Sequence, residues 1–333
     1  METYQNITAS KKRFRTESKF PGIGEEIHID DMVFSLLEDQ KRIDAKFLYD
    51  TTGTRLFQEI CLLRDYYPSR TALHVLKESV IPSLPSYEEV EIVTIGPGDN
   101  LKAKSLVMHM SHRSAKRIRF TPVEFSESAI NITTQSVQNM FENVEINPIH
   151  TDLNEPFTLP EPDMPRIYYM FGSSPGQPED HRTIPLLSTI RSNMNKHDIL
   201  LAGFDRVKPV HILEKAYNDS KGLVAAFNKN VLSVTNRVTA AGIDPSMFVH
   251  QAFFNTKLSR IEMHLKATED LNLHLRKAGL ILGMIRGESI RTATAKKYSR
   301  IDIEETAAAA GFRINELYND AKKWYTIAEL GIA

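Results

Sequence analysis

The stretch Glu91-Ile-Val-Thr-Ile-Gly-Pro-Gly-Asp-Asn100 decides the fold class of this chain. A β-branched run ends in a glycine turn, and an apolar pattern of helical period follows as far as Met110. A strand, a tight turn and a helix in this order form the opening unit of a doubly wound α/β sheet. Gly96 and Gly98 allow the backbone to approach a ligand closely. The third glycine of the dinucleotide fingerprint is absent, so the turn by itself leaves open whether it binds a nucleotide-like ligand.

Further strands and helices alternate after this unit. Strands are predicted over residues 117–124, 144–152, 165–171 and 198–204, and helices over 126–140 and 178–193. Glu124, Asp152 and Gly172 fall, like Gly96, at or just past the ends of strands. Because open α/β sheets bind ligands at the carboxyl ends of their strands, these positions together predict one ligand site. The acid at position 124 suits a pair of ribose hydroxyls.

The pattern changes after the fifth strand. The remaining predicted elements are helices over 211–240, strands over 248–254 and 260–266, a strand or helix over 271–282, a helix over 301–311 and sheet over 312–330. A block inserted at this point, followed by a return to α/β, predicts a second domain threaded through the first. Near the N-terminus, Asp30 and Asp31 predict the N-cap of a helix that begins at Met32. The pair Tyr66-Tyr67 before a proline predicts a bend, whose phenols either line a pocket or pack in the core.

Composition excludes several classes of protein. Lys plus Arg number 41 and Asp plus Glu number 42, a balance that favours neither nucleic acid nor an anionic membrane as partner. Cys61 is the single cysteine, which excludes an intramolecular disulfide and a thiolate metal site. His109 and His112 lie three apart without an evident third ligand, so no metal is predicted. With no apolar run of about 18 residues and no signal-peptide pattern, the cytoplasm is the predicted location. The run Lys296-Lys-Tyr-Ser-Arg300 is predicted to be solvated.

Several stretches together resemble one known family. They are Phe47-Leu-Tyr-Asp50, Tyr66-Tyr-Pro-Ser-Arg70, Ile95-Gly-Pro-Gly98, Phe171-Gly-Ser-Ser174, Ala216-Tyr-Asn-Asp219, Phe227-Asn-Lys-Asn-Val231, Arg260-Ile-Glu-Met-His-Leu265 and Gly287-Glu-Ser-Ile-Arg-Thr292. From about Asp31 to the C-terminus, the chain is similar to the S-adenosylmethionine-dependent histidine Nα-methyltransferases of ergothioneine biosynthesis. The resemblance implies a class I methyltransferase fold, a Rossmann-like doubly wound α/β sheet, with an interleaved α+β substrate-binding domain. It places the substrate-binding domain over 1–70 and 208–290 and the S-adenosylmethionine-binding domain over 71–207 and 291–333.

The resemblance also implies roles for individual residues. Those expected to hold the cofactor S-adenosylmethionine are Gly96, Gly98, Lys102, Glu124, Asp152, Gly172 and Ser173. Tyr49 and Tyr66 match family tyrosines that contact the amino acid and are the predicted catalytic residues, while Tyr217 and Met263 fall in the substrate pocket. The family has aspartate where this chain has Glu124. Because a methyl sulfonium needs only an aligned, uncharged amine, catalysis is expected to consist of positioning and desolvation.

Departures from the family pattern concern the substrate pocket. Gln177 stands where the family has an asparagine that holds the α-amino acid end of the substrate. Ala293 and Ala295 stand where the family has a glutamate and a serine that hold the imidazole ring. Loss of these partners removes the basis for selecting histidine, and an apolar or aromatic side chain suits the alanines.

The predicted function is therefore N-methylation of an amino acid or small amine other than histidine, by a monomer without nucleic-acid or membrane partners. Two other reactions stay open. One is histidine methylation in a rebuilt pocket, and the other uses the amino-acid arm of the sulfonium, by aminocarboxypropyl transfer or intramolecular cyclisation. A non-catalytic relative is a further alternative, against which the retained Gly96, Gly98, Asp152, Tyr49 and Tyr66 count.

Overall fold

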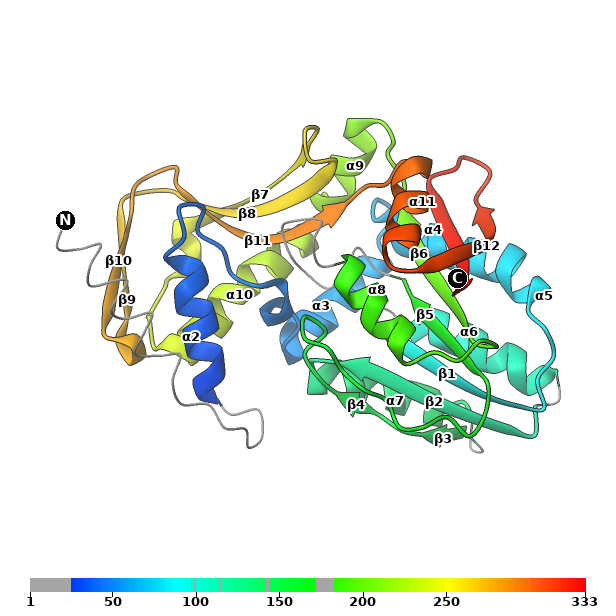
Figure 1. The fold of residues 1–333 in the computed structure, drawn as a ribbon. Coiled ribbons are helices and arrows are strands. Elements are labelled where there is room, and N and C mark those ends of the chain that lie inside the picture. Colours follow the sequence, from blue (N-terminus) through cyan, green and yellow to red (C-terminus); the bar gives the residue numbers. More distant parts are fainter. Residues whose placement is uncertain (1–24, 97, 99, 114, 142–143, 172–182) are drawn as a thin grey trace.

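A central β-sheet forms one end of the computed structural model, which describes residues 25–333 except 97, 99, 114, 142–143 and 172–182 (Figure 1). The strands of this sheet are β1 (Glu89–Ile95), β2 (Arg117–Glu124), β3 (Val144–Ile146), β4 (Ile149–His150), β5 (Arg166–Met170), β6 (Ile199–Asp205), β12 (Phe312–Asn319) and β13 (Tyr325–Ile332). Their order is β12-β13-β6-β5-β1-β2-β3, with β4 also paired to β2. Neighbours from β3 to β6 are parallel, whereas β13 is antiparallel to both β6 and β12. The doubly wound sheet that the glycine turn predicts is confirmed.

The strand predicted over 144–152 is two short strands. β3 ends at Ile146 and β4 begins at Ile149. Pro148 lies between them and has no N–H to donate to the neighbouring strand. Pairing with β2 therefore stops after β3 and resumes at β4, and Asp152 follows two residues after the end of β4.

Helices cover both faces of the central sheet. Successive side chains on a strand point to opposite faces, and buried apolar side chains occur on both. On β1, Val90 and Ile92 belong to one core and Val93 and Ile95 to another. The helices on the first face are α4 (Tyr67–Val75) with its continuations η2 (Leu76–Val80) and α5 (Ile81–Ser83), α6 (Asn100–His112) and α7 (Glu127–Gln138). Those on the second face are α8 (Thr183–Ser192) and α11 (Arg300–Ala309).

The other end of the molecule is built around a three-stranded antiparallel sheet of order β11-β8-β7 (Figure 1). Its elements are α2 (Glu25–Leu36), η1 (Ala45–Leu48), α3 (Thr51–Cys61), α9 (Val210–Tyr217), α10 (Leu223–Thr239), η3 (Pro245–Met247), β7 (Phe248–Asn255), β8 (Arg260–Ala267), β9 (Leu271–Leu275), η4 (Arg276–Ala278), β10 (Leu280–Met284) and β11 (Ser289–Lys296). A third hydrophobic core joins the N-terminal segment to these later elements.

The pairing of β11 indicates where the boundary between the two expected domains lies. It spans residues 289–296 and pairs with β8 along its length. Residues 291–296 therefore belong to the three-stranded sheet, although the expected boundary assigns them to the other domain. The two-domain division stays a prediction, and a boundary after Lys296 follows the hydrogen bonding better.

One local prediction needs correction, and one open alternative is resolved. The N-cap predicted at Asp30 and Asp31 is wrong, because α2 begins at Glu25 and both aspartates lie inside it. Ile29 packs against the same core as Met32, so burial favours helix before the aspartates as well as after them. The ambiguous segment 271–282 forms the antiparallel strands β9 and β10.

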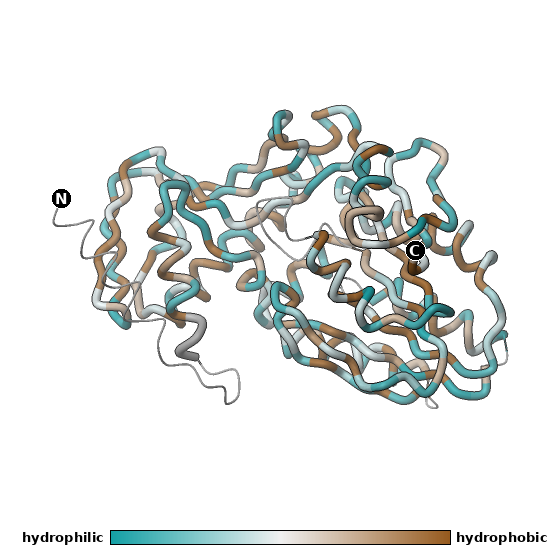
Figure 2. The backbone as a smooth tube through the Cα atoms, viewed as in Figure 1, coloured by the Kyte–Doolittle hydropathy of each residue, from teal (hydrophilic) through white to brown (hydrophobic). Residues whose placement is uncertain are grey.

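Hydropathy varies over short distances along the chain (Figure 2). None of the helices in the described part of the chain is both long enough and apolar enough to span a membrane.

Candidate active site

One cavity lies where the carboxyl ends of β1, β2 and β5 meet elements of the three-stranded sheet. It brings together all predicted site residues that the structure describes: Tyr49, Tyr66, Gly96, Gly98, Lys102, Glu124, Asp152, Tyr217, Met263, Ala293 and Ala295. The remaining predicted residues, Gly172, Ser173 and Gln177, lie outside the described residues. Side chains from distant parts of the sequence thus converge on one space, while the role of each stays a prediction.

The glycine turn forms the edge of the cavity next to β1. Gly96 (φ 66°) and Gly98 (φ 59°) adopt the left-handed conformation, which disfavours other residues. A Cβ on Gly96 would face Oε2 of Glu124 at 3.8 Å, so the turn borders space that a ligand can occupy. Lys102 follows on the buried face of α6, and its Nζ donates to Oγ of Ser69 at 3.2 Å. A bare backbone edge beside a buried ammonium suits a ligand with an anionic group.

Glu124 is anchored by the backbone that follows it. Its Oε1 accepts hydrogen bonds from the backbone nitrogens of Phe125 at 2.9 Å and Ser126 at 3.1 Å. Burial raises the pKa of this carboxyl, an effect that the two backbone hydrogen bonds oppose. With Oε1 held in this way, Oε2 lies beside Gly96 at the edge of the cavity. The carboxylate therefore presents one oxygen to a ligand in a fixed direction.

Asp152 is paired with a lysine that sequence reasoning missed. Its Oδ2 lies 2.8 Å from Nζ of Lys46, and its Oδ1 accepts from the backbone nitrogen of Asn154 at 2.9 Å. Lys46 also reaches Asp31 in α2, at 3.1 Å. Burial lowers the pKa of Lys46, but the hydrogen bond and charge of Asp152, helped by Asp31, outweigh burial and raise it. The only sequence signal was the position of Lys46 just before the stretch that contains Tyr49.

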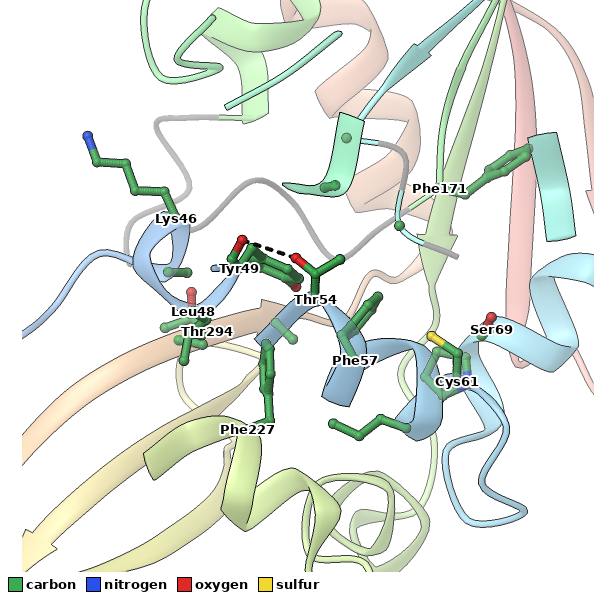
Figure 3. Close-up of a pocket in the computed structure, with 18 of the residues that line it drawn as sticks. Lys46, Leu48, Tyr49, Thr54, Phe57, Cys61, Ser69, Phe171, Phe227 and Thr294 are labelled. Carbon is green, nitrogen blue, oxygen red and sulfur yellow. Dashed lines mark hydrogen bonds between the residues drawn. The ribbon is translucent and has the colours of Figure 1, made fainter. Parts of the chain in front are cut away.

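Tyr49 is held in place where η1 meets α3. Its carbonyl oxygen accepts hydrogen bonds from Oγ1 of Thr54 at 3.1 Å (Figure 3) and from Oγ of Ser126 at 2.6 Å. α3 packs directly on the carbonyl oxygen of Leu48, because a Cβ on Gly53 would lie 1.7 Å from that atom. Glycine at position 53 is therefore required for the close approach that fixes Tyr49.

Five aromatic rings form one wall of the cavity. The ring centroids of Tyr49 and Phe57, and of Tyr49 and Phe227, are 5.4 Å apart (Figure 3), and those of Tyr66 and Tyr217 are 5.8 Å apart. Burial raises the pKa of both Tyr49 and Tyr66, so their phenols stay neutral at physiological pH. Sequence reasoning missed Phe57 and Phe227, since an aromatic residue on a helix is more often part of the core.

A β-bulge turns two alanines towards the cavity. The register of β11 against β8 shifts between Arg291 and Ala293, after which Ala293 lies opposite Met263 and Ala295 opposite Ile261. Directly opposed residues point to the same face of a sheet, so all four side chains share the face that lines the cavity. The extra residue of the bulge is Thr292, whose Oγ1 donates to the Met263 carbonyl at 3.1 Å. Ala293, Ala295, Met263 and Ile261 make this end of the cavity largely apolar, and Thr294 also lines it.

A buried polar network lies behind the aromatic wall. Asp205 accepts a hydrogen bond from the phenol of Tyr67 at 2.8 Å and lies 2.9 Å from Nζ of Lys297. Lys297 also donates to the phenol oxygen of Tyr217 at 3.2 Å, and Lys208 donates to that of Tyr67 at 2.9 Å. Burial lowers the pKa of Lys208 to about 8, although Asp205 opposes the effect. Asp205 ends β6, so its position at the carboxyl edge of the sheet was a signal that sequence reasoning left unused.

The solvation predicted for residues 296–300 is wrong for Lys297, which is fully buried. Its backbone nitrogen donates to the Ser259 carbonyl at 2.7 Å, and the next residue, Tyr298, donates to the Asp205 carbonyl at 2.8 Å. The chain leaving β11 is thus drawn across the end of β6, where Asp205 provides the counter-charge for the lysine.

A doubly wound sheet with a glycine turn, a buried lysine and strand-end carboxylates around one cavity is the arrangement in which Rossmann-like domains bind nucleotide-like ligands. A family model described as histidine-specific methyltransferase, SAM-dependent, matches residues 29–331. The chain belongs to this family. The resemblance, the class I fold, the cofactor and the enzyme class inferred from the sequence are thereby confirmed.

Relatives act on different amino acids, according to their names. A histidine N-alpha-methyltransferase from Mycobacterium tuberculosis (strain CDC 1551 / Oshkosh) is 31% identical over 281 residues, which cover 84% of this chain and 87% of the relative. A 4-dimethylallyltryptophan N-methyltransferase from Trichophyton verrucosum is 22% identical over 306 residues, which cover 87% of each. An S-adenosylmethionine-dependent methyltransferase structure from Clostridium acetobutylicum ATCC 824 aligns with a TM-score of 0.42 and 6% identity, over 78% of this chain and 97% of that one.

The residues around the glycine turn fit S-adenosylmethionine. The space beside Gly96 borders a free edge of Glu124, which can accept hydrogen bonds from ribose hydroxyls. Lys102 offers a buried cation on the same cavity for the carboxylate of the methionine part. Within the described residues, no group of three or more His, Cys, Asp or Glu side chains is placed to hold a metal ion.

Proposed function

We propose that this methyltransferase acts on the amino group of an amino acid or small amine that carries an apolar or aromatic side chain, and not on histidine. The observation that carries the proposal is the apolar end of the cavity, where Ala293 and Ala295 face the same space as Met263. The methyl groups of the two alanines neither donate nor accept hydrogen bonds, so they cannot hold an imidazole ring. An apolar acceptor side chain gains free energy by leaving water for such a surface. The relative named for 4-dimethylallyltryptophan supports an aromatic acceptor.

In this proposal, residues of the glycine edge hold the cofactor. Gly96 and Gly98 allow close approach of the backbone, Glu124 accepts from the ribose hydroxyls, and Lys102 pairs with the carboxylate. Asp152, joined to Lys46, completes the polar rim. When bound, S-adenosylmethionine supplies a methyl group on a positively charged sulfur.

The aromatic wall prepares the acceptor. Because burial keeps the phenols of Tyr49 and Tyr66 neutral, their oxygens can accept a hydrogen bond from an amine N–H and so fix the direction of the nitrogen lone pair. Phe57 and Phe227 exclude water from this region, which favours the uncharged amine. Tyr49 and Tyr66 act in this scheme by orientation, and no protein nucleophile takes part.

Mass spectrometry of purified protein with S-adenosylmethionine and a panel of amino acids and amines tests the proposal. We expect a methylated aromatic or aliphatic amino compound together with S-adenosylhomocysteine. Efficient methylation of histidine would contradict the assigned specificity. Methylthioadenosine formed without any acceptor would contradict methyl transfer and favour use of the amino-acid arm. A cytoplasmic monomer without nucleic-acid partners stays the prediction from the sequence, which size-exclusion chromatography and cell fractionation can test.

A further inference from the structure

Asn228 is a fully buried amide on α10, one residue after Phe227 of the aromatic wall. Its Nδ2 donates to the His264 carbonyl on β8 at 3.1 Å and lies 2.9 Å from Nδ1 of His250 on β7. Its Oδ1 accepts a hydrogen bond from Oγ1 of Thr292 on β11. One side chain of α10 is therefore joined to all three strands of the sheet β11-β8-β7.

The hydrogen bonds of His250 fix the direction in which this amide points. The carbonyl oxygen of Tyr217 can only accept, so Nε2 of His250, which lies 2.9 Å from it, carries a hydrogen. Burial lowers the pKa of His250, although the hydrogen bond with the Tyr217 carbonyl opposes this effect. The ring is then neutral at physiological pH, and its Nδ1 is an acceptor. Asn228 therefore presents its NH2 group to His250 and its oxygen to Thr292.

The oxygen of Asn228 lies at the β-bulge of β11. Between residues 291 and 293, β11 advances two positions while β8 advances one. The extra residue, Thr292, is buried, and its hydroxyl hydrogen is shared between Oδ1 of Asn228 and the Met263 carbonyl. A bulge leaves its extra residue without a partner in the strand pairing. The hydroxyl of Thr292 supplies partners that stabilise the bulge.

Regular pairing would turn the side chains that follow to the other face. Without the extra residue, Thr292 would lie opposite Met263 and Ala293 would lie opposite Glu262, because each position would move by one. Met263 and Glu262 are adjacent on β8 and so point to opposite faces. The methyl group of Ala293 would then leave the apolar end of the cavity, and the larger side chain of Thr292 would enter it. Less space would remain for the side chain of an acceptor.

We propose that Asn228 is a positioning residue for acceptor specificity: its amide holds the bulge at Thr292 and thereby keeps Ala293 on the face of β11 that lines the acceptor end of the cavity. The inference rests on the proposed function and deepens it, because it names what sets the size of acceptor side chain that fits. Neither Asn228 nor Thr292 is among the described residues that line the cavity. Asn228 acts through Thr292 and has no contact with the reacting atoms.

A competition between acceptors of different size tests the inference. Purified protein is given S-adenosylmethionine with equal amounts of L-tryptophan, L-phenylalanine, L-leucine and L-alanine, and mass spectrometry measures the ratio of methylated large acceptors to methylated alanine. Thr292→Val removes the hydroxyl at nearly constant size. We expect the ratio to fall about tenfold in this variant, as is typical for a small change of size in an apolar pocket. Thr292→Ser keeps the hydroxyl and should preserve the wild-type ratio.

Two further variants separate this role from a general loss of packing. Thr235→Val is the matched control, because Thr235 is a fully buried threonine of α10 whose hydroxyl donates to the Val231 carbonyl at 2.9 Å. We expect the ratio to stay unchanged there. Asn228→Leu should lower the ratio as Thr292→Val does, and the two together should cause no further fall, since the hydroxyl acts through the amide. S-adenosylhomocysteine should bind equally well to every variant, which shows that each is folded.

Three results would overturn the role of Asn228. They are an unchanged ratio in Asn228→Leu, an equal fall in Thr235→Val, and an added fall when Thr292→Val is combined with Asn228→Leu. If a single variant at position 228 or 292 does not fold, Thr292→Ala removes the same hydroxyl, and an unchanged ratio in that protein contradicts the inference.

Hydrogen–deuterium exchange of residues 289–296 tests the bulge without any acceptor. We expect faster exchange in Thr292→Val than in Thr292→Ser, and equal exchange in the two variants would contradict the role of Asn228. A wild-type protein that binds S-adenosylhomocysteine but methylates no apolar or aromatic amino acid or amine contradicts the proposed function itself, and the exchange measurement still decides whether Asn228 holds the bulge.

Discussion

Nζ of Lys46 lies 2.8 Å from Oδ2 of Asp152, so η1 at the acceptor wall is joined directly to a strand-end carboxylate of the central sheet. The two residues are 106 positions apart in the sequence, and their side chains are 11% and 25% exposed. Because both line the same cavity, this ion pair connects the region expected to hold the acceptor with the region expected to hold the cofactor.

Removal of that ion pair should destabilise the protein measurably. We expect Lys46→Met to lower the free energy of unfolding by about 0.5–1 kcal/mol, a value at the upper end for partly exposed pairs. Urea titration followed by circular dichroism measures the change. Lys116→Met is the control, since Lys116 and Glu88 form a pair whose side chains are 76% and 83% exposed, and no change is expected there. Equal effects in the two variants would show that Lys46 adds nothing through Asp152.

The specificity of the cavity should respond to its two alanines. We expect the double variant Ala293→Glu, Ala295→Ser to gain methylation of histidine, because it restores polar partners for an imidazole ring at the positions where the family has them. Activity with apolar acceptors should fall in the same variant, since the new carboxylate loses hydration when such a side chain binds. Mass spectrometry of competing acceptors in one tube measures the ratio. An unchanged ratio would mean that other residues set the specificity.

Glu124 should contribute to cofactor affinity. Glu124→Gln keeps the size of the side chain but places a neutral amide beside Gly96, so we expect S-adenosylhomocysteine to bind about tenfold more weakly. Glu127→Gln provides the control, because Glu127 has the same chemistry and is 78% exposed on α7. Calorimetric titration measures the affinity of both variants for S-adenosylhomocysteine. Equal affinities would show that Glu124 does not contribute to cofactor binding.

Gly53 should be intolerant of any side chain. A Cβ there would lie 1.7 Å from the Leu48 carbonyl oxygen, so α3 must move for alanine to fit. We expect Gly53→Ala to cost about 1–3 kcal/mol or more of folding free energy. In Gly283→Ala, by contrast, the nearest atom is Oδ1 of Asn272 at 3.8 Å, and thermal unfolding should be nearly unchanged. A stable Gly53→Ala protein would show that α3 can shift easily.

Glu262 should make folding stability depend on acid pH. Burial by itself raises the pKa of Glu262, but hydrogen bonds from His264 and Arg260 lower it to about 2. The unfolded chain, with a pKa near 4.5, takes up a proton first as the pH falls. The stabilisation is therefore complete above pH 4.5 and is lost progressively towards pH 2. Glu262→Gln should show a smaller loss of stability over this range in urea titrations, whereas Glu304→Gln, which alters an exposed pair with Arg300, should follow the wild-type curve.

Residues whose positions follow from local sequence patterns, such as the ends of strands, were predicted correctly from the sequence. Glu124 and Asp152 could be placed at one edge because each follows a predicted strand, and parallel strands share an edge. Pro148 carried a signal that was overlooked, since its missing N–H already implied a break in pairing. Lys297 could not be placed in this way, because its burial depends on the counter-charge of Asp205 on another strand. The bulge at Thr292, which decides the direction of Ala293, likewise arises only when β11 pairs with β8.

The link between Lys41 and Glu288 spans 247 positions of the chain, and the backbone of Ile43 donates to the Arg291 carbonyl beside it. During synthesis, the segment that carries Tyr49 is therefore made long before its neighbouring strand β11. The parallel strands β1 to β6 can assemble while this segment still waits for its partner, and closing so large a loop is slow. Until β11 has been synthesised, the apolar side chains of α2 lack part of the core that covers them, and such exposed apolar surface favours aggregation of incompletely folded chains.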